Sequence, residues 1–331
     1  MILRRSLLAA TLVVLAACTP KPDAAKVPES GEATTIRFAT DWRAQAEHGG
    51  FYQALASGAY ARRGLKVEIV QGGPNVNVPQ LLASNAVELG MGSNSFIVMN
   101  LAQEGVPVKA VAAFMQKDPQ VLIAHPDAGV NSLADLKGRP ILLSDASVSA
   151  FWVWLKAKYG FSDDQVRKYT FNSAPFLADK RAAQQGYVTS EPYTIEKQAG
   201  FKPKVFLLAD EGYPGYATMV LATDALIAKN PAAVKAFVEA SAEGWREYLA
   251  GDGKAADALI LKDNPEMTAD VLAQAREKLK SYRIVEGAEG APVGTMTDAR
   301  WKTFFDAASA QGVYPKSLDP KRAYTLAFLP K

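Results

Sequence analysis

The sequence of 331 residues contains one cysteine and two histidines. A single thiol cannot form a disulfide within the chain, so a disulfide-stapled scaffold is excluded. Two histidines alone are too few for a typical metal site. We therefore expect no metal and no other cofactor.

The chain also lacks a large excess of one charge, since 37 Lys and Arg residues face 34 Asp and Glu residues. Two of the arginines, Arg4 and Arg5, lie in a segment that we expect to be removed. No block of like charge recurs beside aromatic residues, so the electrostatic footprint of nucleic-acid binding is missing. Hydrophobic residues make up 49% of the chain, which excludes intrinsic disorder and predicts a globular protein.

Long apolar runs are missing apart from one near the N-terminus. Arg4 and Arg5 precede an apolar run from Leu7 to Ala17. This run is about eleven residues long, too short to cross a hydrocarbon core of about 30 Å, and the pattern is typical of a secretory signal. It ends in Leu-Ala-Ala-Cys, which resembles the lipobox of bacterial lipoproteins. That resemblance implies that Cys18 is the lipid-attachment residue, and an ordinary signal peptide is the alternative.

Residues 19–34 are rich in Pro, Ala, Lys and Glu and have little to bury. Such a composition is typical of a flexible tether. Two or more acyl chains hold a protein stably at a bilayer. We therefore interpret residues 1–18 as a lipoprotein signal peptide with its lipobox, followed by a tether between the membrane and the folded part.

Short β-branched runs alternate with helical patterns beyond the tether, which implies parallel sheets with crossover helices. We expect strands at 35–39, 66–70, 88–91, 108–114, 121–124, 141–144, 168–171, 186–189, 204–208 and 217–222. We expect helices at 50–63, 78–85, 95–104, 148–159 and 230–249. A further helix is expected to begin at Asn264-Pro265, because Pro is favoured in the first turn.

This order predicts an α/β protein of two lobes, with the second lobe inserted into the first. Residues 35–118 and 216–331 would form lobe 1, and residues 119–215 would form lobe 2. Open parallel sheets bind ligands beyond the carboxyl ends of their strands. Two facing lobes would therefore surround a shared cleft, where we expect the binding residues.

Three segments carry a family resemblance. The first, at 40–68, contains Thr-Asp-Trp, His-Gly-Gly-Phe-Tyr-Gln-Ala, Gly-Ala-Tyr and Gly-Leu-Lys-Val-Glu. The second is Val-Glu-Leu-Gly-Met-Gly-Ser-Asn at 87–94, and the third is Ser-Leu-Ala-Asp-Leu-Lys-Gly-Arg at 132–139. Together they resemble the periplasmic binding proteins for thiamine pyrimidine precursors, a family that includes the nitrate, taurine and sulfonate binding proteins.

The resemblance implies a periplasmic binding protein fold of type II, in which each lobe is a mostly parallel sheet flanked by helices and the ligand cleft lies between the lobes. It also implies a lipid-anchored monomer in the periplasm that delivers a small-molecule solute to an ABC permease with a cytoplasmic ATPase. The chain has no Gly-x-x-x-x-Gly-Lys-Ser/Thr loop, so the ATPase must be a different protein.

Asp41 and Trp42 follow the first expected strand, at its cleft end. In the pyrimidine-binding branch a Trp here stacks on the ring, and a well-set aromatic pair contributes about 0.5–1.5 kcal/mol. Alternatively, Trp42 packs on the Gly49-Gly50 turn and Asp41 only forms a turn. His48 can donate and accept a hydrogen bond, which suits a heteroaromatic or anionic ligand, although a structural role is also open.

Tyr52 belongs to the same motif and is a further candidate contact. Ser93 and Asn94 follow the expected strand at 88–91, where they can reach the cleft or cap the next helix. Tyr213, in the segment that returns to lobe 1, can close over a flat ligand or pack as part of the hinge.

Tyr187 and Glu191 are the candidates from lobe 2. In relatives that bind aminopyrimidines, an acidic residue at about this point takes the ring amino group, and such a charged hydrogen bond contributes about 1.5–3 kcal/mol. Alternatively, Glu191 is only a charge at a helix start.

Acidic groups on both sides of the cleft and the lack of an obvious Arg clamp favour a neutral or weakly basic heteroaromatic solute, such as a thiamine pyrimidine precursor. The alternative ligand is an anion of the sulfonate, taurine or nitrate kind. An enzyme is not expected, because no Gly-x-Ser-x-Gly elbow is present and Cys18 is assigned to the lipid. A cleft enzyme built on Asp41 and Glu191 and a lipid-tethered sensor remain alternatives.

Overall fold

The computed structural model describes residues 33–286 and 292–330. The expected signal peptide, Cys18 and the tether as far as residue 32 lie outside these ranges. Within them, no helix combines the length and the apolar character that a bilayer crossing requires.

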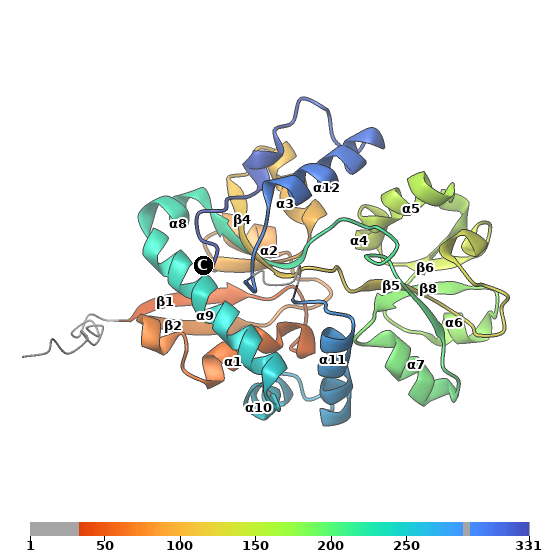
Figure 1. Ribbon diagram of the computed structural model, residues 1–331, viewed down its shortest axis with the longest axis horizontal. Coiled ribbons are helices and arrows are strands. Elements are labelled where there is room, and N and C mark those ends of the chain that lie inside the picture. The colour runs from red at the N-terminus through yellow and green to blue at the C-terminus, as the bar shows by residue number, and fades with distance from the viewer. Residues whose placement is uncertain (1–32, 287–291, 331) are drawn as a thin grey trace, which may run out of the picture. The chain divides into compact units, whose positions relative to one another are not determined.

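The described residues form two five-stranded sheets, and we call each sheet with its helices a lobe (Figure 1). The strand order is β2-β1-β3-β10-β4 in lobe 1 and β7-β6-β8-β5-β9 in lobe 2. In each sheet one described strand runs opposite to the other four, namely β10 in lobe 1 and β5 in lobe 2. Four strands of each sheet therefore run the same way, which confirms the predicted mostly parallel sheets.

The strands of lobe 1 are β1 (Thr34–Ala39), β2 (Leu65–Val70), β3 (Leu89–Asn94), β4 (Val108–Met115) and β10 (Ala217–Thr223). Those of lobe 2 are β5 (Gln120–Ala124), β6 (Ile141–Leu143), β7 (Val166–Lys168), β8 (Ala183–Tyr187) and β9 (Lys204–Leu207). Strands β4, β5 and β10 are almost continuously apolar because helices cover both faces of each sheet.

The described α-helices are α1 (Gly49–Ala56), α2 (Val78–Ala83), α3 (Ser95–Gln103), α4 (Asp145–Val148), α5 (Phe151–Tyr159), α6 (Ala174–Ala178), α7 (Glu191–Ala199), α8 (Asp224–Lys229), α9 (Pro231–Ala250), α10 (Lys254–Asp263), α11 (Ala269–Ser281) and α12 (Asp298–Ala310). Short 3₁₀ turns lie at Ala46–His48, Ala61–Arg63, Leu133–Leu136, Asp163–Gln165 and Pro320–Ala323. Asn230 caps α9 by accepting a 3.1 Å hydrogen bond from Ala233 N, so this predicted start is confirmed.

Several predicted boundaries are wrong. The helix expected at 148–159 is two helices, because Ala150 leaves the helical conformation at φ −121° and ψ −113°. The helix expected from Asn264 begins instead at Ala269, and Asn264 ends α10 with its side chain donating to Ala44 O at 2.9 Å. The strand expected at 186–189 ends at Tyr187, and the helix expected at 50–63 ends at Ala56.

Two glycines of the first family motif allow α1 to pack against α9. A Cβ atom at Gly50 would lie 2.1 Å from Trp245 Cγ, and one at Gly49 would lie 2.1 Å from a ring carbon of Tyr248. Only glycine fits such a close approach. These two aromatic residues of α9 cover Gly49 and Gly50, so Trp42 does not occupy that position.

The chain passes between the lobes at residues 116–119 and 208–216. Arg300 of α12 joins both passages, donating to Gly215 O at 2.8 Å, to Pro214 O at 3.1 Å and to Gln116 O. Its guanidinium carbon lies 4.1 Å from the centre of the Tyr216 ring, a distance typical of a cation–π contact. Arg300 therefore ties the two connecting segments to each other and to the C-terminal part of the chain.

Candidate functional site

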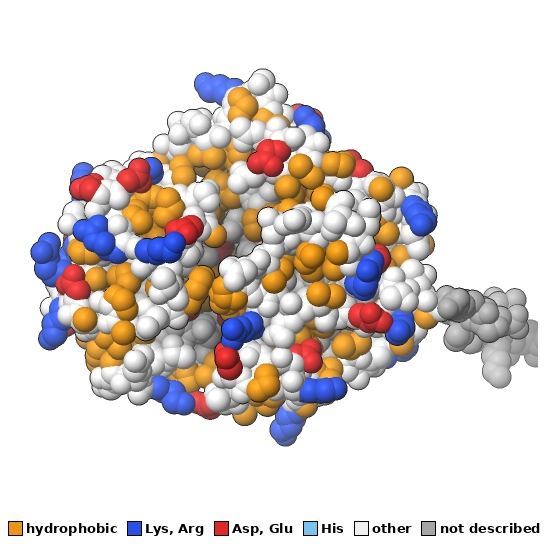
Figure 2. Space-filling view, turned by 180° about the vertical axis from the view of Figure 1, so that it is seen from behind, with side chains coloured by type: hydrophobic (Ala, Val, Ile, Leu, Met, Phe, Trp, Pro, Cys, Tyr) orange, Lys and Arg blue, Asp and Glu red, His pale blue; other side chains and the backbone are white. Residues whose placement is uncertain are grey.

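The carboxyl ends of several strands face one another where the lobes meet. In lobe 1, β1 and β3 lead into Asp41 and Ser93, while in lobe 2 β8 ends at Tyr187. This is the edge at which an open α/β sheet binds its ligand. The surface seen in Figure 2 carries positive and negative side chains interspersed and is hollowed near its middle.

Asp41, His48 and Ser93 form one connected group in lobe 1. His48 Nε2 lies 3.3 Å from Asp41 Oδ1, and Ser93 Oγ donates a hydrogen bond to Asp41 Oδ2. The His48 side chain is fully buried. His48 therefore holds Asp41 in place, and its direct contact with a ligand stays a prediction.

Tyr52 connects two helices of lobe 1. Its side chain is 1% exposed, and its hydroxyl donates to Asp263 Oδ2 at 2.9 Å. This contact fastens α1 to α10, and the contact of Tyr52 with a ligand stays a prediction. The 3.6-residue repeat of the helix turns its side chain towards α10, which the motif alone did not reveal.

Asn94 and Tyr213 take the structural roles that were left open for them. Asn94 Oδ1 accepts a 3.0 Å hydrogen bond from Phe96 N and caps α3. Tyr213 is buried beside the connecting segment, with its ring 5.4 Å from that of Trp154 in an edge-to-face arrangement. The Tyr213 ring thus packs as part of the hinge.

Trp42 reaches across to the other lobe. Its ring centre lies 4.7 Å from that of Phe171, at an interplanar angle of 45°. Phe171 lies three residues after the end of β7 and was not predicted as a site residue. Its exposed ring distinguishes it in the structure. The sequence does not reveal which side chains are exposed, so it gave no signal for Phe171.

Glu191 begins α7 and folds back over the end of β8. Its Oε2 accepts a 2.8 Å hydrogen bond from Tyr187 N, and Tyr169 Oη lies 3.5 Å from its Oε1. A Cβ atom at Gly186 would lie 2.8 Å from Glu191 Cβ, so glycine makes room for this arrangement. Burial raises the pKa of Glu191 to about 7, against the opposing hydrogen bond from Tyr187.

Trp42 and Glu191 are connected by a chain of side-chain contacts at the interface between the lobes. The Phe171 ring, which contacts Trp42, is centred 5.3 Å from the Tyr169 ring, and Tyr169 in turn contacts Glu191. The two side chains that the sequence singled out are thus linked by two aromatic rings.

Glu47 is a buried carboxyl group that sequence reasoning missed. It accepts a hydrogen bond from Thr189 Oγ1 in lobe 2, and the carbonyl of Thr189 accepts one from Gln274 on α11. Burial raises the pKa of Glu47, although the Thr189 hydrogen bond works against this shift. Its position next to His48 in the family motif was an available signal.

The charges of four acidic residues act on Tyr187; we call Asp41, Glu47, Asp118 and Glu191 the acidic cluster. Burial raises the pKa of Tyr187 well above its usual value, and the charges of all four carboxyl groups act in the same direction. Carboxyl groups of lobe 1, of lobe 2 and of a connecting segment thus all act on the Tyr187 hydroxyl.

Asp118 is the member of this cluster that lies on a connecting segment. Burial raises its pKa to about 7, while a backbone hydrogen bond of 3.0 Å from Gln120 and the charge of Arg300 oppose that rise. Ionised or neutral, the carboxyl oxygens of this cluster accept hydrogen bonds, which suits solutes that donate them. In the described ranges, no group of three or more His, Cys, Asp or Glu side chains is arranged to hold a metal.

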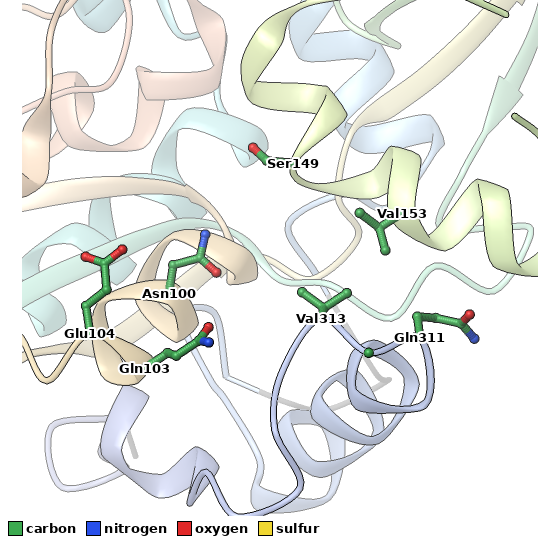
Figure 3. A pocket seen from close by; sticks show the side chains of 8 residues that line it. Asn100, Gln103, Glu104, Ser149, Val153, Gln311 and Val313 are labelled. Carbon is green, nitrogen blue, oxygen red and sulfur yellow. The ribbon is translucent and has the colours of Figure 1, made fainter. Parts of the chain in front are cut away.

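A separate cavity of about 710 Å³ opens between the lobes beside α3 (Figure 3). Asn100 and Gln103 of α3 line one side, Ser149 and Val153 line the other, and Val313 lies between them. None of the predicted site residues lines this cavity, whose walls mix polar and apolar side chains. We therefore place the candidate binding site at the acidic cluster and Trp42.

Comparison with known proteins identifies relatives of this chain. A family model described as NMT1/THI5 like matches residues 45–255, which confirms the family resemblance. The riboflavin-binding protein RibY of Chloroflexus aurantiacus is 30% identical over 291 residues, covering 85% of this chain and 82% of the relative. The formylaminopyrimidine-binding protein of Halalkalibacterium halodurans is 24% identical over 275 residues, covering 81% and 82%.

An enzyme is also among the relatives. The 4-amino-5-hydroxymethyl-2-methylpyrimidine phosphate synthase of Schizosaccharomyces pombe is 24% identical over 226 residues, which are 62% of this chain and 63% of the enzyme. Among solved structures, the periplasmic aliphatic sulphonate binding protein SsuA from Escherichia coli superposes with a TM-score of 0.68. It is 15% identical, and the match covers 91% of this chain and 95% of SsuA. The chain therefore has the periplasmic binding protein fold.

Proposed function

The chain belongs to the NMT1/THI5-like family, and on this premise we propose that it is the solute-binding component of an ABC importer, specific for a flat, neutral or weakly basic heteroaromatic solute. The observation that carries this proposal is the pairing of Trp42 with an acidic cluster where the two lobes meet. An aromatic face and hydrogen-bond acceptors at its edge suit a planar ring that carries N–H groups.

Two kinds of ring share this chemistry, namely an aminopyrimidine and the isoalloxazine ring of a flavin. Each is flat and presents at least one N–H donor along its edge. The relatives named for riboflavin and for a formylaminopyrimidine support this class. We propose that Trp42 stacks on the ring and that Glu191 accepts the hydrogen bond from its edge.

An anionic solute is the alternative. The fold neighbour SsuA is named for aliphatic sulphonates, but a sulfonate or nitrate needs cationic side chains or N–H donors that face it. The positive charge of Arg300 opposes the rise that burial causes in the pKa of Asp118. Its guanidinium donates to backbone carbonyls of the connecting segments and is therefore already engaged. The cluster therefore favours the heteroaromatic class.

A cleft enzyme built on Asp41 and Glu191 is the remaining class. Asp41 already contacts His48 and Ser93, and Glu191 already accepts from Tyr187 N. Carboxyl groups held in this way are suited to positioning a bound solute. We propose binding and delivery as the function, with the periplasm as the location and the lipid at Cys18 as the anchor.

Calorimetry on the purified chain without residues 1–18 tests the proposal. Riboflavin and 4-amino-5-aminomethyl-2-methylpyrimidine would be titrated beside taurine, an alkanesulfonate and nitrate. We expect micromolar or tighter affinity for at least one of the two heteroaromatic compounds, which corresponds to about −8 kcal/mol or better. Binding of only the anions would overturn the proposal in favour of the alternative.

A further inference from the structure

Phe171 is the most exposed of the four large hydrophobic residues that stand out from the described surface, with half of its area open to solvent. The other three are Leu55, Val70 and Val76, all aliphatic residues of lobe 1. A large aromatic side chain left in water forgoes the free energy of burial. Its exposure therefore calls for a reason other than packing.

The backbone of Phe171 is also strained. Its φ of +61° lies in the left-handed region, which is unfavourable for a bulky side chain and is usually taken by Gly or Asn. Asn172 follows immediately and would be better suited to that conformation. Non-glycine residues keep such a conformation when the surroundings impose it, often at ligand sites.

The strained turn aims the Phe171 ring at the other lobe. The ring lies 4.7 Å from that of Trp42 and 5.3 Å from that of Tyr169, measured between ring centres. Tyr169 is buried and contacts Glu191, so the base of the turn is fixed to the acidic cluster. One ring thus faces Trp42 from lobe 2 while the cluster lies at its side.

We propose that Phe171 forms the second aromatic wall of the solute site, so that a flat ring is held between Trp42 on lobe 1 and Phe171 on lobe 2. This inference rests on the proposed function and adds a specificity-determining residue to it. The two rings now touch, so a solute enters only when the lobes part. Closure then returns Phe171 to the exposed face of the bound ring.

Such a two-sided site selects for flatness. A ring stacked on Trp42 alone would tolerate a bulky group on its free face, whereas a ring between two walls must be flat on both faces. Phe171 would therefore set the solute class, and the acidic cluster would set the orientation of the ring edge.

Four variants test this inference by calorimetry with riboflavin and the aminomethyl-pyrimidine. Phe171→Asn removes the ring and suits the left-handed backbone, so we expect at least tenfold weaker binding with a melting temperature equal to or above that of the wild type. Phe171→Ala should weaken binding equally. Phe171→Tyr should retain affinity within about threefold, because it keeps an aromatic wall. Leu55→Ala, an exposed apolar truncation on α1, is the control and should bind like the wild type.

Tryptophan emission checks the contact between the Phe171 and Trp42 rings in solution. Removing the Phe171 ring exposes the Trp42 indole, so we expect a red shift in Phe171→Ala that disappears in a Trp42→Phe background. If Trp42→Ala abolishes heteroaromatic binding while Phe171→Asn and Phe171→Ala bind like the wild type, the second wall is refuted and the proposed function stands. If the wild type binds neither compound, both are refuted.

Discussion

Tyr193, at the start of α7 in lobe 2, donates a 2.8 Å hydrogen bond to the carboxylate of Asp270 on α11. Helix α11 packs within lobe 1, where Arg276 forms a 2.7 Å ion pair with Asp257 of α10. Lys197 of α7 reaches the same Asp270 oxygen at 2.6 Å. One carboxylate of lobe 1 therefore binds two side chains of lobe 2, beside the contact between Thr189 and Glu47.

Asp270→Asn should loosen this contact between the lobes. The Asp270 contacts are exposed and screened by solvent, so their loss costs little stability, and affinity for the solute should fall by less than about tenfold. Small-angle scattering should show a larger radius of gyration without solute than for the wild type. Asp252→Asn breaks a comparable exposed pair with Lys254, away from the second lobe, and should change neither quantity. Identical scattering and affinity for Asp270→Asn would show that this contact does not hold the lobes together.

Trp42→Ala should weaken binding of the heteroaromatic solute at least tenfold, because it removes the stacking face together with its apolar area. The melting temperature should change little, since Trp42 is not part of the buried core. Trp42→Phe should recover most of the affinity. Calorimetry and thermal unfolding on the same samples measure both effects. A large drop in melting temperature would instead indicate that Trp42 mainly stabilises the fold.

Glu191 makes the stability depend on pH. Its pKa rises from an ordinary 4.5 to about 7 in the folded protein, chiefly through burial. The folded state then binds more protons than the unfolded state between these values, so its contribution to the free energy of unfolding falls as the pH rises from about 4.5 through 7. Asp118, whose pKa is likewise raised to about 7 by burial, acts in the same direction.

Glu191→Gln should remove part of this dependence. Denaturant unfolding at pH 5 and pH 8 should show a difference between these conditions that is on the order of 1–2 kcal/mol smaller in the variant than in the wild type. Glu196→Gln, at an exposed position on the same helix, is the matched control. Equal pH dependence in the wild type and Glu191→Gln would contradict the raised pKa.

Arg300→Lys should destabilise the connection between the lobes. Lysine keeps the charge but cannot reproduce the fork that binds the carbonyls of Pro214 and Gly215 together with Gln116. We expect the free energy of unfolding to fall by about 1–3 kcal/mol. Lys302→Ala, an exposed change on the same helix, should have no comparable effect. Denaturant titrations of both variants would settle the comparison, and equal stability would refute the role of Arg300 as a clamp.

Cys18→Ala should abolish membrane attachment. Expressed in a bacterium that processes lipoproteins, the wild type should incorporate labelled palmitate and partition into detergent, because acyl chains provide the affinity for the bilayer. The variant should do neither. Labelling of the variant would refute the lipobox, and the absence of labelling in both proteins would support an ordinary signal peptide.

Much of the fold follows from local patterns. The alternation of β-branched runs and helical repeats predicted two α/β lobes, and the ends of β1 and β8 placed Asp41, Trp42 and Tyr187 near a shared edge. Boundaries failed where a local signal was misleading, as at Asn264-Pro265, where the asparagine ends one helix and does not begin another.

The sequence by itself determined the alternation of strands and helices, because backbone preferences and hydrophobic spacing act over a few residues. Only the tertiary structure decided which side chains meet. Thr189 lies 142 positions from Glu47, and Tyr52 turns to Asp263 across 211 positions. Phe171 gained its exposed, strained position from the turn that carries it. Such contacts depend on how distant helices and sheets pack, and no local repeat encodes that packing.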